Sequence, residues 1–232
     1  MHSLNNKVVL VTGAKGGLGT FVTHAFLDEG ATVVGVSRSI AAADFSHAQF
    51  VAMPAELASV ESAAMLAAGI VERFQRIDAV VHLVGGFAGG KSVAETDDAA
   101  MDRMFELNFR SAFHIARAVT PQMRRQRSGR ILAVGTRAAV EPGPMTGAYN
   151  ASKAALVSLI RTIASENRDV CISANIVLPG TMDTPANRAA DPQADFSKWV
   201  QPAQVAAMLV HLASDAAAQV TGAVIPVYGR DV

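Results

Sequence analysis

The chain has 232 residues, half of them hydrophobic, and it carries 20 basic and 20 acidic side chains, so its formal net charge is zero. A neutral chain offers no basic face for nucleic acid or for an anionic membrane surface, and neither is expected as a partner. The single cysteine, Cys171, excludes an internal disulfide and a cysteine-based metal site. Its apolar neighbours predict that it is buried, and no metal site is expected.

No apolar run reaches the roughly 18 residues that a membrane helix needs. The first residues hold no apolar stretch typical of a signal peptide. We therefore expect a cytoplasmic protein that acts on a small molecule. No linker, charge block or internal repeat divides the sequence, which predicts a single domain over residues 1–232.

Short β-branched runs alternate along the chain with longer segments of helical period. The predicted strands are 7–12, 32–36, 50–53, 79–84, 130–135, 170–178 and 223–228. The predicted helices are 17–29, 59–74, 99–126, 147–167 and 202–213. Continuously apolar strands are typical of parallel strands covered on both faces, and their alternation with helices implies right-handed crossovers. The expected fold is α/β, with a doubly wound, seven-stranded parallel sheet.

Three glycine-, proline- and polar-rich loops follow predicted strands, at 85–91, 136–147 and 179–199. Ligands of open α/β sheets bind outside the carboxyl ends of the strands. We therefore expect these three loops to surround the functional site.

Three glycines, Gly13, Gly17 and Gly19, join the first strand to the first helix. Glycine lets the backbone turn tightly and approach a pyrophosphate, and the helix N-terminus offers free N–H groups. The same cluster on its own also fits an ordinary strand-to-helix turn. With the strand before it and the tyrosine motif described below, it predicts a dinucleotide site that also includes Lys15 and Leu18.

The end of the second strand is where an acidic residue would bind the adenosine ribose hydroxyls of a dinucleotide. This chain has Ser37-Arg38 there. No carboxylate repels a 2′-phosphate, and Arg38, assisted by Lys15, can pair with one through charge-assisted hydrogen bonds. We therefore favour NADP(H) over NAD(H); the alternative is that Arg38 is a solvated surface residue.

Tyr149 and Lys153 are four residues apart, which places them on one face of a helix. A phenol has a pKa near 10, and roughly 4 kcal/mol of added phenolate stabilisation is needed to bring it near 7. A nearby cation can supply this stabilisation. Thr136, thirteen residues upstream, can donate a hydrogen bond to a substrate oxygen or, alternatively, bond the local backbone. The set predicts proton transfer at a substrate hydroxyl or carbonyl, and hence an oxidoreductase.

Four motifs occur in order along the chain: Thr12-Gly13-x-x-x-Gly17-x-Gly19, Leu107-Asn108-Phe109, Tyr149-x-x-x-Lys153 and Pro179-Gly180-x-x-x-Thr184. On these motifs the chain resembles the short-chain dehydrogenase/reductase family over nearly its whole length. The resemblance implies a single domain of Rossmann type and a nicotinamide cofactor. Two positions depart from the family pattern. His82-Leu-Val-Gly85 replaces Asn-Asn-Ala-Gly, and Thr136 replaces the usual catalytic serine.

The resemblance also implies roles for individual residues. Tyr149 would be the acid/base, Lys153 would also bind the nicotinamide ribose, and Asn108 would hold a water of a proton relay. A structural hydrogen bond is the alternative for Asn108, an asparagine amid an apolar helical pattern. His82 is expected to be a satisfied core histidine rather than a metal ligand. Further cofactor contacts are implied at Glu56, Leu57, Val84, Gly85, Val177, Pro179, Gly180, Thr181 and Thr184.

A more local resemblance, to dihydropteridine reductase of the same family, covers Gly85–Gly90, Glu141–Tyr149 and Met182–Trp199 in part. We expect Phe87, Met145 and the segment 183–199 to face the substrate. That segment has the composition of a mobile lid, although Trp199 could instead anchor the next helix. Broad apolar stripes on helices 99–126 and 147–167 suggest, by family resemblance, a homo-oligomer, either a tetramer or a dimer.

Three functions are weighed on these observations. The favoured one is an NADP(H)-dependent oxidoreductase acting on a small carbonyl or hydroxyl compound. Reduction of a quinonoid pterin is the nearest alternative, and a non-catalytic nucleotide-sensing protein is the alternative of another class. An extended sugar epimerase is disfavoured because little chain remains for a separate substrate domain.

Overall fold

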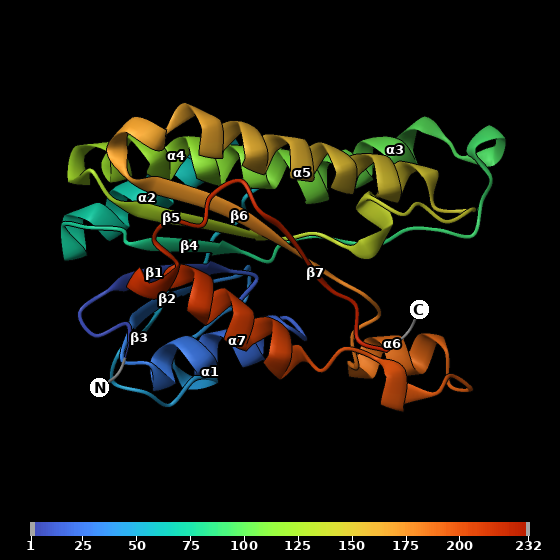
Figure 1. Cartoon of the computed structure of the whole chain (residues 1–232), viewed down its shortest axis with the longest axis horizontal. Coiled ribbons are helices and arrows are strands. Elements are labelled where there is room, and N and C mark those ends of the chain that lie inside the picture. The colour runs from blue at the N-terminus through green and yellow to red at the C-terminus, as the bar shows by residue number, and fades with distance from the viewer. Residues whose placement is uncertain (1–2, 231–232) are drawn as a thin grey trace.

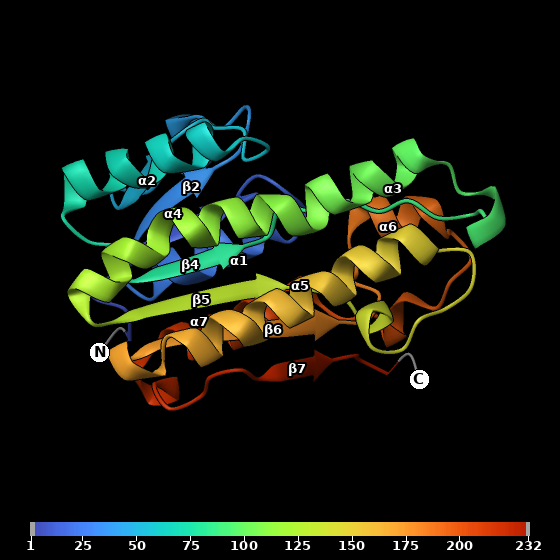
Figure 2. The ribbon, with the colours of Figure 1, turned by 90° about the horizontal axis from the view of Figure 1, so that it is seen from above.

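The structure, a computed structural model, describes residues 3–230 (Figures 1 and 2). Seven parallel strands form one sheet in the order β3-β2-β1-β4-β5-β6-β7. The strands are β1 Val8–Thr12, β2 Thr32–Val36, β3 Phe50–Ala52, β4 Ala79–His82, β5 Gly129–Val134, β6 Ile172–Pro179 and β7 Val224–Val227. The predicted doubly wound, seven-stranded parallel sheet is therefore confirmed.

Helices cover both faces of the sheet (Figure 1). They are α1 Gly19–Asp28, α2 Val60–Phe74, α3 Asp98–Phe105, α4 Ser111–Gln126, α5 Gly147–Glu166, α6 Pro185–Ala190 and α7 Pro202–Ala213. One face carries α2, α4 and α5, and the other carries α1 and α7. Within residues 3–230, none of these helices combines the length and the apolar character needed to cross a bilayer.

Successive side chains of a strand point to opposite faces of the sheet, so each strand contributes side chains to two separate cores. In β1, Val8 and Leu10 pack into the core under α2, α4 and α5, whereas Val9 and Val11 pack into the core under α1 and α7. Every residue of β1 is buried, because both faces of a parallel sheet are covered. The continuously apolar runs in the sequence are therefore the direct consequence of this three-layer arrangement.

The strand order reverses direction between β1 and β4, which creates the topological switch point where ligands bind in such sheets. The chain turns tightly after β1 at Gly13, whose φ is +72°. A Cβ atom at Gly13 would lie 3.2 Å from the backbone carbon of Leu83, just beyond β4. The two loops thus meet backbone to backbone at the switch point, and only glycine allows this approach.

Two expectations need correction. The single helix expected over 99–126 is divided by a π-helical turn at Glu106–Arg110, which separates α3 from α4. Cys171 is exposed rather than buried, because it sits in the turn before β6 with a φ of +56°. In this turn the alternation of β6 does not apply, so the apolar neighbours in the sequence do not place the thiol in the core.

Candidate active site

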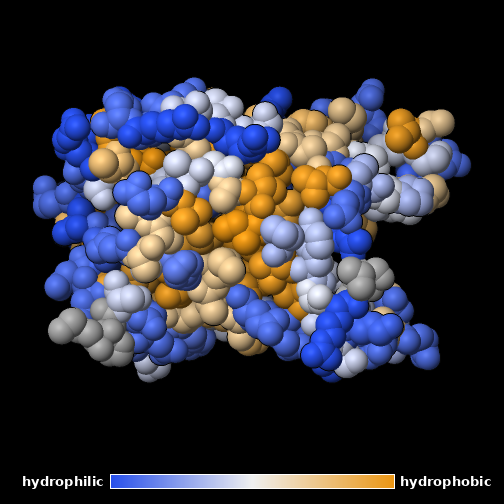
Figure 3. Space-filling view, in the orientation of Figure 1, coloured by the Kyte–Doolittle hydropathy of each residue, from blue (hydrophilic) through white to orange (hydrophobic). Residues whose placement is uncertain are grey.

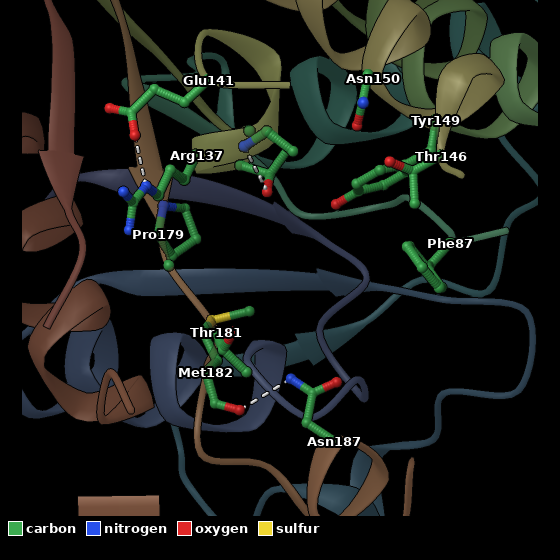
Figure 4. Close-up of a pocket in the computed structure, with 14 residues that line it drawn as sticks. Phe87, Arg137, Glu141, Thr146, Tyr149, Asn150, Pro179, Thr181, Met182 and Asn187 are labelled. Atoms are coloured by element: carbon green, nitrogen blue, oxygen red, sulfur yellow. Dashed lines mark hydrogen bonds and ion pairs between the residues drawn. The ribbon is translucent and has the colours of Figure 1, made fainter. Parts of the chain in front are cut away.

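A cleft of about 440 Å³ opens beyond the carboxyl ends of β5 and β6, beside the start of α5 (Figure 4). Figure 4 shows Tyr149 with its hydroxyl directed into this cleft, with Phe87 and Thr146 close by. Met182 and Asn187, which follow β6, form the facing wall. The cleft brings together two of the three loops that the sequence predicted to surround the site, and Phe87 from the third.

The Thr136 hydroxyl lies near the Tyr149 hydroxyl, close enough to act on the pKa of the phenol. Thr136 follows β5 and caps the short 3-10 turn Arg137–Ala139, and its Oγ1 accepts a bond from the N–H of Ala138 at 3.4 Å. Because an oxygen can accept that bond and still donate its proton, both roles considered for Thr136 are compatible. Burial raises the pKa of the Tyr149 phenol, and the Thr136 hydroxyl opposes this shift.

Lys153 lies one turn beyond Tyr149 on α5 and is 7% exposed. Its Nζ donates a hydrogen bond to the carbonyl oxygen of Val134 at 3.2 Å. Burial lowers the pKa of Lys153 to about 8. The sequence led us to expect that Lys153 lowers the pKa of Tyr149. In the protein itself, burial dominates and Thr136 is the group that favours the phenolate.

Asn108 is fully buried in the π-helical turn and bridges three elements. Its Oδ1 accepts from the N–H of Gly86 at 2.9 Å, and its Nδ2 donates to the carbonyl of Gly86 at 3.1 Å and to Ser152 Oγ at 3.0 Å. π turns occur often at functional sites because they redirect a side chain. The structural hydrogen bond that the sequence left open for Asn108 is therefore present.

Gly85 marks the point where Asn108 and Lys153 converge. A Cβ atom there would lie 2.8 Å from Asn108 Oδ1 and 3.1 Å from Lys153 Nζ. A side chain at Gly85 would therefore have to displace the Asn108 amide or the Lys153 amine. The loop after β4 thus passes close over both polar groups.

The glycine turn forms a cradle at the N-terminus of α1. A Cβ atom at Gly19 would lie 2.0 Å from the carbonyl oxygen of Gly13, so a side chain cannot be accommodated without moving the turn. A Cβ atom at Gly17 would meet only Thr184 Cγ2, at 3.6 Å. Thr184, which caps α6, is thereby placed beside the glycine turn.

The end of β2 carries Ser37 and Arg38 next to this turn. The Oγ of Ser37 is buried and has no hydrogen-bond partner in residues 3–230. Arg38 is exposed and forms no ion pair within the same part of the chain. Lys15, which was expected to assist Arg38, instead pairs with Asp44 at 2.8 Å. Both features fit a dinucleotide. A bound dinucleotide would give the Ser37 hydroxyl a hydrogen-bond partner and would lie against the glycine cradle.

The remaining residues of the predicted cofactor site are placed as follows. Leu18 and Leu57 have side chains buried in the two cores, so only their backbones are available to a ligand. Glu56 is exposed, and Val84 packs against a core. Pro179, Gly180 and Thr181 line the cleft, whereas Val177 is fully buried beneath it.

His82 is a core histidine, as expected. It is 3% exposed, with Nδ1 at 3.0 Å from Thr12 Oγ1 and Nε2 at 3.2 Å from Ser111 Oγ. Because the hydroxyl of Ser111 donates to the carbonyl of Leu107, it accepts from the imidazole, which assigns the proton to Nε2. Burial and the charge of Lys153 lower the pKa of His82 to about 3.

Of the three single residues expected on the substrate side, only Phe87 lines the main cleft. Phe87 is 67% exposed and packs edge-on against the Tyr149 ring, with the centroids 5.0 Å apart. Met145 lines a smaller neighbouring cavity with Gly89. The Trp199 ring packs at a tilt against the Phe196 ring, and Trp199 lines a third cavity within the expected lid segment, outside the main cleft.

Several residues of the cleft were not anticipated from the sequence. Arg137 and Glu141 form an ion pair on its wall at 2.6 Å, and the Arg137 guanidinium lies 5.1 Å from the Tyr228 ring centroid. The signal in the sequence was their i, i+4 spacing directly after Thr136. Asn187 donates to the carbonyl of Met182 at 2.8 Å and could not have been found without the fold.

No group of three or more histidine, cysteine or acidic side chains within residues 3–230 is arranged to hold a metal ion. The cleft is instead lined by the Tyr149 phenol, by threonine hydroxyls and asparagine amides and by the Arg137–Glu141 ion pair, and the Lys153 amine lies buried behind Tyr149. These are groups that hold and move protons.

Comparison with known proteins agrees with this geometry. The family model described as short chain dehydrogenase matches residues 7–195. A rhamnolipids biosynthesis 3-oxoacyl-[acyl-carrier-protein] reductase of Pseudomonas aeruginosa is 31% identical over 248 residues, which cover 98% of this chain and 96% of that protein. The crystal structure of a short-chain dehydrogenase/reductase from Burkholderia xenovorans is 29% identical, with a TM-score of 0.86 and coverage of 98% and 96%.

The structure of ElxO with NADP bound has a TM-score of 0.90, covering 96% of this chain and 97% of that one, and at 22% identity it supports the fold alone. The family model covers most of the chain, and the relative from Pseudomonas aeruginosa spans almost all of it. The chain therefore belongs to the short-chain dehydrogenase/reductase family and is an oxidoreductase that uses a nicotinamide cofactor.

Proposed function

We propose that this enzyme transfers a hydride between NADP(H) and a small carbonyl or hydroxyl substrate. The observation that carries the proposal is the Tyr149 hydroxyl, which faces the cleft, lies near Thr136 and has Lys153 buried one turn behind it. A pure nucleotide-binding protein needs no such proton donor. The relative from Pseudomonas aeruginosa, described as a 3-oxoacyl reductase, supports a carbonyl substrate.

The bound nicotinamide would supply the hydride, and the protein would handle the proton and the charge on the substrate oxygen. Because burial raises the pKa of Tyr149, the phenol stays protonated and ready to donate to that oxygen during reduction. Thr136 would donate a second hydrogen bond to the same oxygen, which stabilises the developing negative charge. Lys153 would bind the nicotinamide ribose and return a proton to Tyr149, with Asn108 fixing the loop above it and holding a relay water.

The preference for NADP(H) is proposed on Ser37 and Arg38. An unpartnered buried hydroxyl beside an exposed, unpaired guanidinium suits a ribose that carries a 2′-phosphate. Charge-assisted hydrogen bonds contribute about 1.5–3 kcal/mol. Arg38→Gln is therefore expected to raise the Kd of NADPH about tenfold to a hundredfold and to leave that of NADH nearly unchanged. Equal effects on both cofactors, measured by fluorescence titration, would contradict the assignment.

The reaction is tested by following NADPH oxidation with three kinds of substrate: acetoacetyl thioesters, simple ketones and quinonoid dihydropterin. Turnover of a ketone or a thioester that is lost in Tyr149→Phe supports the proposal. Turnover of the pterin alone would mean that the substrate is a quinonoid pterin and not a carbonyl compound. Cofactor binding without turnover of any carbonyl compound would count against the proposed reaction.

We also propose that the enzyme is a homo-oligomer. Figure 3 shows a band of hydrophobic surface across the side of the molecule where β7 forms the edge of the sheet. The outer face of α4 and α5 adds an apolar hollow, in which Phe113 is 41% exposed. Light scattering during gel filtration should give a dimer or a tetramer, and the mass of one chain at all concentrations would refute this proposal.

A further inference from the structure

A second cavity, of about 320 Å³, lies at the edge of the sheet opposite to the active site. It opens where β5 and β6 begin, beside the segment that follows α7. Figure 2 shows the direction in which these two strands run. Its polar lining consists of Ser128, Arg130, Arg168, Cys171, Ser173 and Thr221 among others. Nothing in the proposed hydride transfer uses these residues.

Two buried polar side chains reach this cavity from neighbouring strands. Arg130 on β5 and Ser173 on β6 are direct partners in the parallel register, so their side chains project from the same face of the sheet. Arg130 is 8% exposed and Ser173 is 2% exposed. Arg130 Nε and Ser173 Oγ are both buried and have no hydrogen-bond partner in residues 3–230. Buried polar groups without a partner are uncommon, and two in adjacent positions indicate that a partner belongs there.

One edge of the Arg130 guanidinium lacks a hydrogen-bond partner. Its Nη1 donates to the carbonyl oxygens of Gly129 at 3.0 Å and of Cys171 at 3.4 Å. Its Nη2 has only a long ion pair with Asp215, at 3.8 Å, and Nε has none. The Nε–Nη2 edge is the one that binds the two oxygens of a carboxylate or phosphate in parallel.

The local charge also favours an anion. Asp215 is 77% exposed and is shared with Lys7 at 3.7 Å, so it neutralises Arg130 only weakly. Arg168, on the rim, is exposed and forms no ion pair within the described part of the chain. Its neighbour Asp169 pairs with Arg124 instead. The cavity is therefore lined by two arginines, and the carboxylate that pairs with one of them, Asp215, is loosely held and lies outside the lining.

We propose that this cavity is a second ligand site, which binds a small oxyanion through its carboxylate or phosphate group. The anion would lie against the Nε–Nη2 edge of Arg130, accept a hydrogen bond from Ser173 Oγ and pair with Arg168 at the entrance. A small rotation of the Arg130 side chain, away from its long contact with Asp215, would bring Nε to the cavity surface.

Cys171 provides a reporter for this site, because it is the only cysteine of the chain, is exposed and lines the same cavity. The experiment measures the rate at which iodoacetamide alkylates Cys171 with inorganic phosphate, with malonate, or with chloride at the same ionic strength and pH. An oxyanion at about ten times its Kd should slow alkylation by about tenfold, since only about one site in ten then stays open. Chloride should have no comparable effect.

Two variants localise the effect. Arg168→Gln and Ser173→Ala should each abolish most of the protection, and Ser173→Ala should not destabilise the free protein, since it removes an unpartnered hydroxyl. Arg38→Gln is the matched control, because it removes a cation at the opposite edge of the sheet and should leave protection intact.

Protection by phosphate or by malonate supports the site and identifies which oxyanion it prefers. The proposal is overturned if neither anion slows alkylation, or if Arg168→Gln and Ser173→Ala are protected as well as the unchanged protein.

Discussion

Replacing the buried histidine His82 by asparagine should remove a large part of the acid sensitivity of this protein. His82 lies between Thr12 and Ser111, with its proton assigned to Nε2, and burial holds its pKa at about 3 in place of 6.5. Below pH 6.5, His82 is therefore protonated in the unfolded chain, whereas it stays neutral in the folded protein. For a group with a lowered pKa of this kind, stability is fully present above pH 6.5 and is lost as the pH falls toward 3.

The size of the effect follows from these two pKa values. Between pH 7 and pH 5 the unfolded chain gains about 2 kcal/mol from protonation of this one histidine, at about 1.4 kcal/mol per pH unit once it is protonated. Lys153, with its pKa of about 8, is charged in both states over this range and adds nothing to the difference. Carboxylates also titrate near pH 5, but they are the same in both proteins and cancel when the variant is compared.

The assay is urea unfolding of the unchanged protein and of His82→Asn, each at pH 7 and pH 5. Asparagine keeps a polar group near Thr12 and cannot titrate. The unchanged protein should lose about 2 kcal/mol more on acidification than the variant does. The prediction concerns only the difference between these two losses of unfolding free energy, whatever effect the substitution has on stability at pH 7. Equal losses in both proteins would refute the claim that His82 is neutral in the folded state.

The other predictions concern the active site and the glycine cradle. Tyr149→Phe should lower kcat by about a hundredfold or more while leaving the Kd of NADPH within about twofold, as measured by steady-state kinetics and fluorescence titration. Thr136→Ser should retain turnover, whereas Thr136→Ala should lose about a hundredfold in kcat; equal activity of the two would remove the hydroxyl from the mechanism. Gly19→Ala should cost at least about 1–3 kcal/mol in urea unfolding, because its Cβ would meet Gly13 at 2.0 Å, and the matched Gly17→Ala should cost little.

The sheet could be predicted from the sequence because its strands are short, continuously apolar and bounded by glycine or polar turns. The predicted limits of β2 agree with the structure, and those of the other strands differ by one or two residues. The division of the helix 99–126 could not be foreseen. A π turn changes the hydrogen-bond register by one residue but leaves the apolar period nearly intact, so Leu107–Phe109 reads as ordinary helix.

The site was predictable where motif and topology coincide, and not elsewhere. Tyr149, Lys153 and Thr136 come together because β5 ends and α5 begins at the same edge of the sheet. The ion pair of Lys15 with Asp44 joins two loops, and no local sequence pattern predicts it. Cys171 is exposed because its own backbone is left-handed, and its apolar neighbours in the sequence do not indicate that conformation. Such contacts depend on how loops cross, which is decided by tertiary packing.

Asn108 also determines which parts of the cleft can move independently. It holds the loop after β4 at both backbone groups of Gly86 and holds α5 through Ser152. The base of the loop that carries Phe87 is therefore fastened to the helix that carries Tyr149 and Lys153. Hinge motion in this loop has to begin beyond Gly86, so the rim of the cleft can open while its floor stays fixed. A substrate can then enter and leave without disturbing the distance between the phenol and the amine.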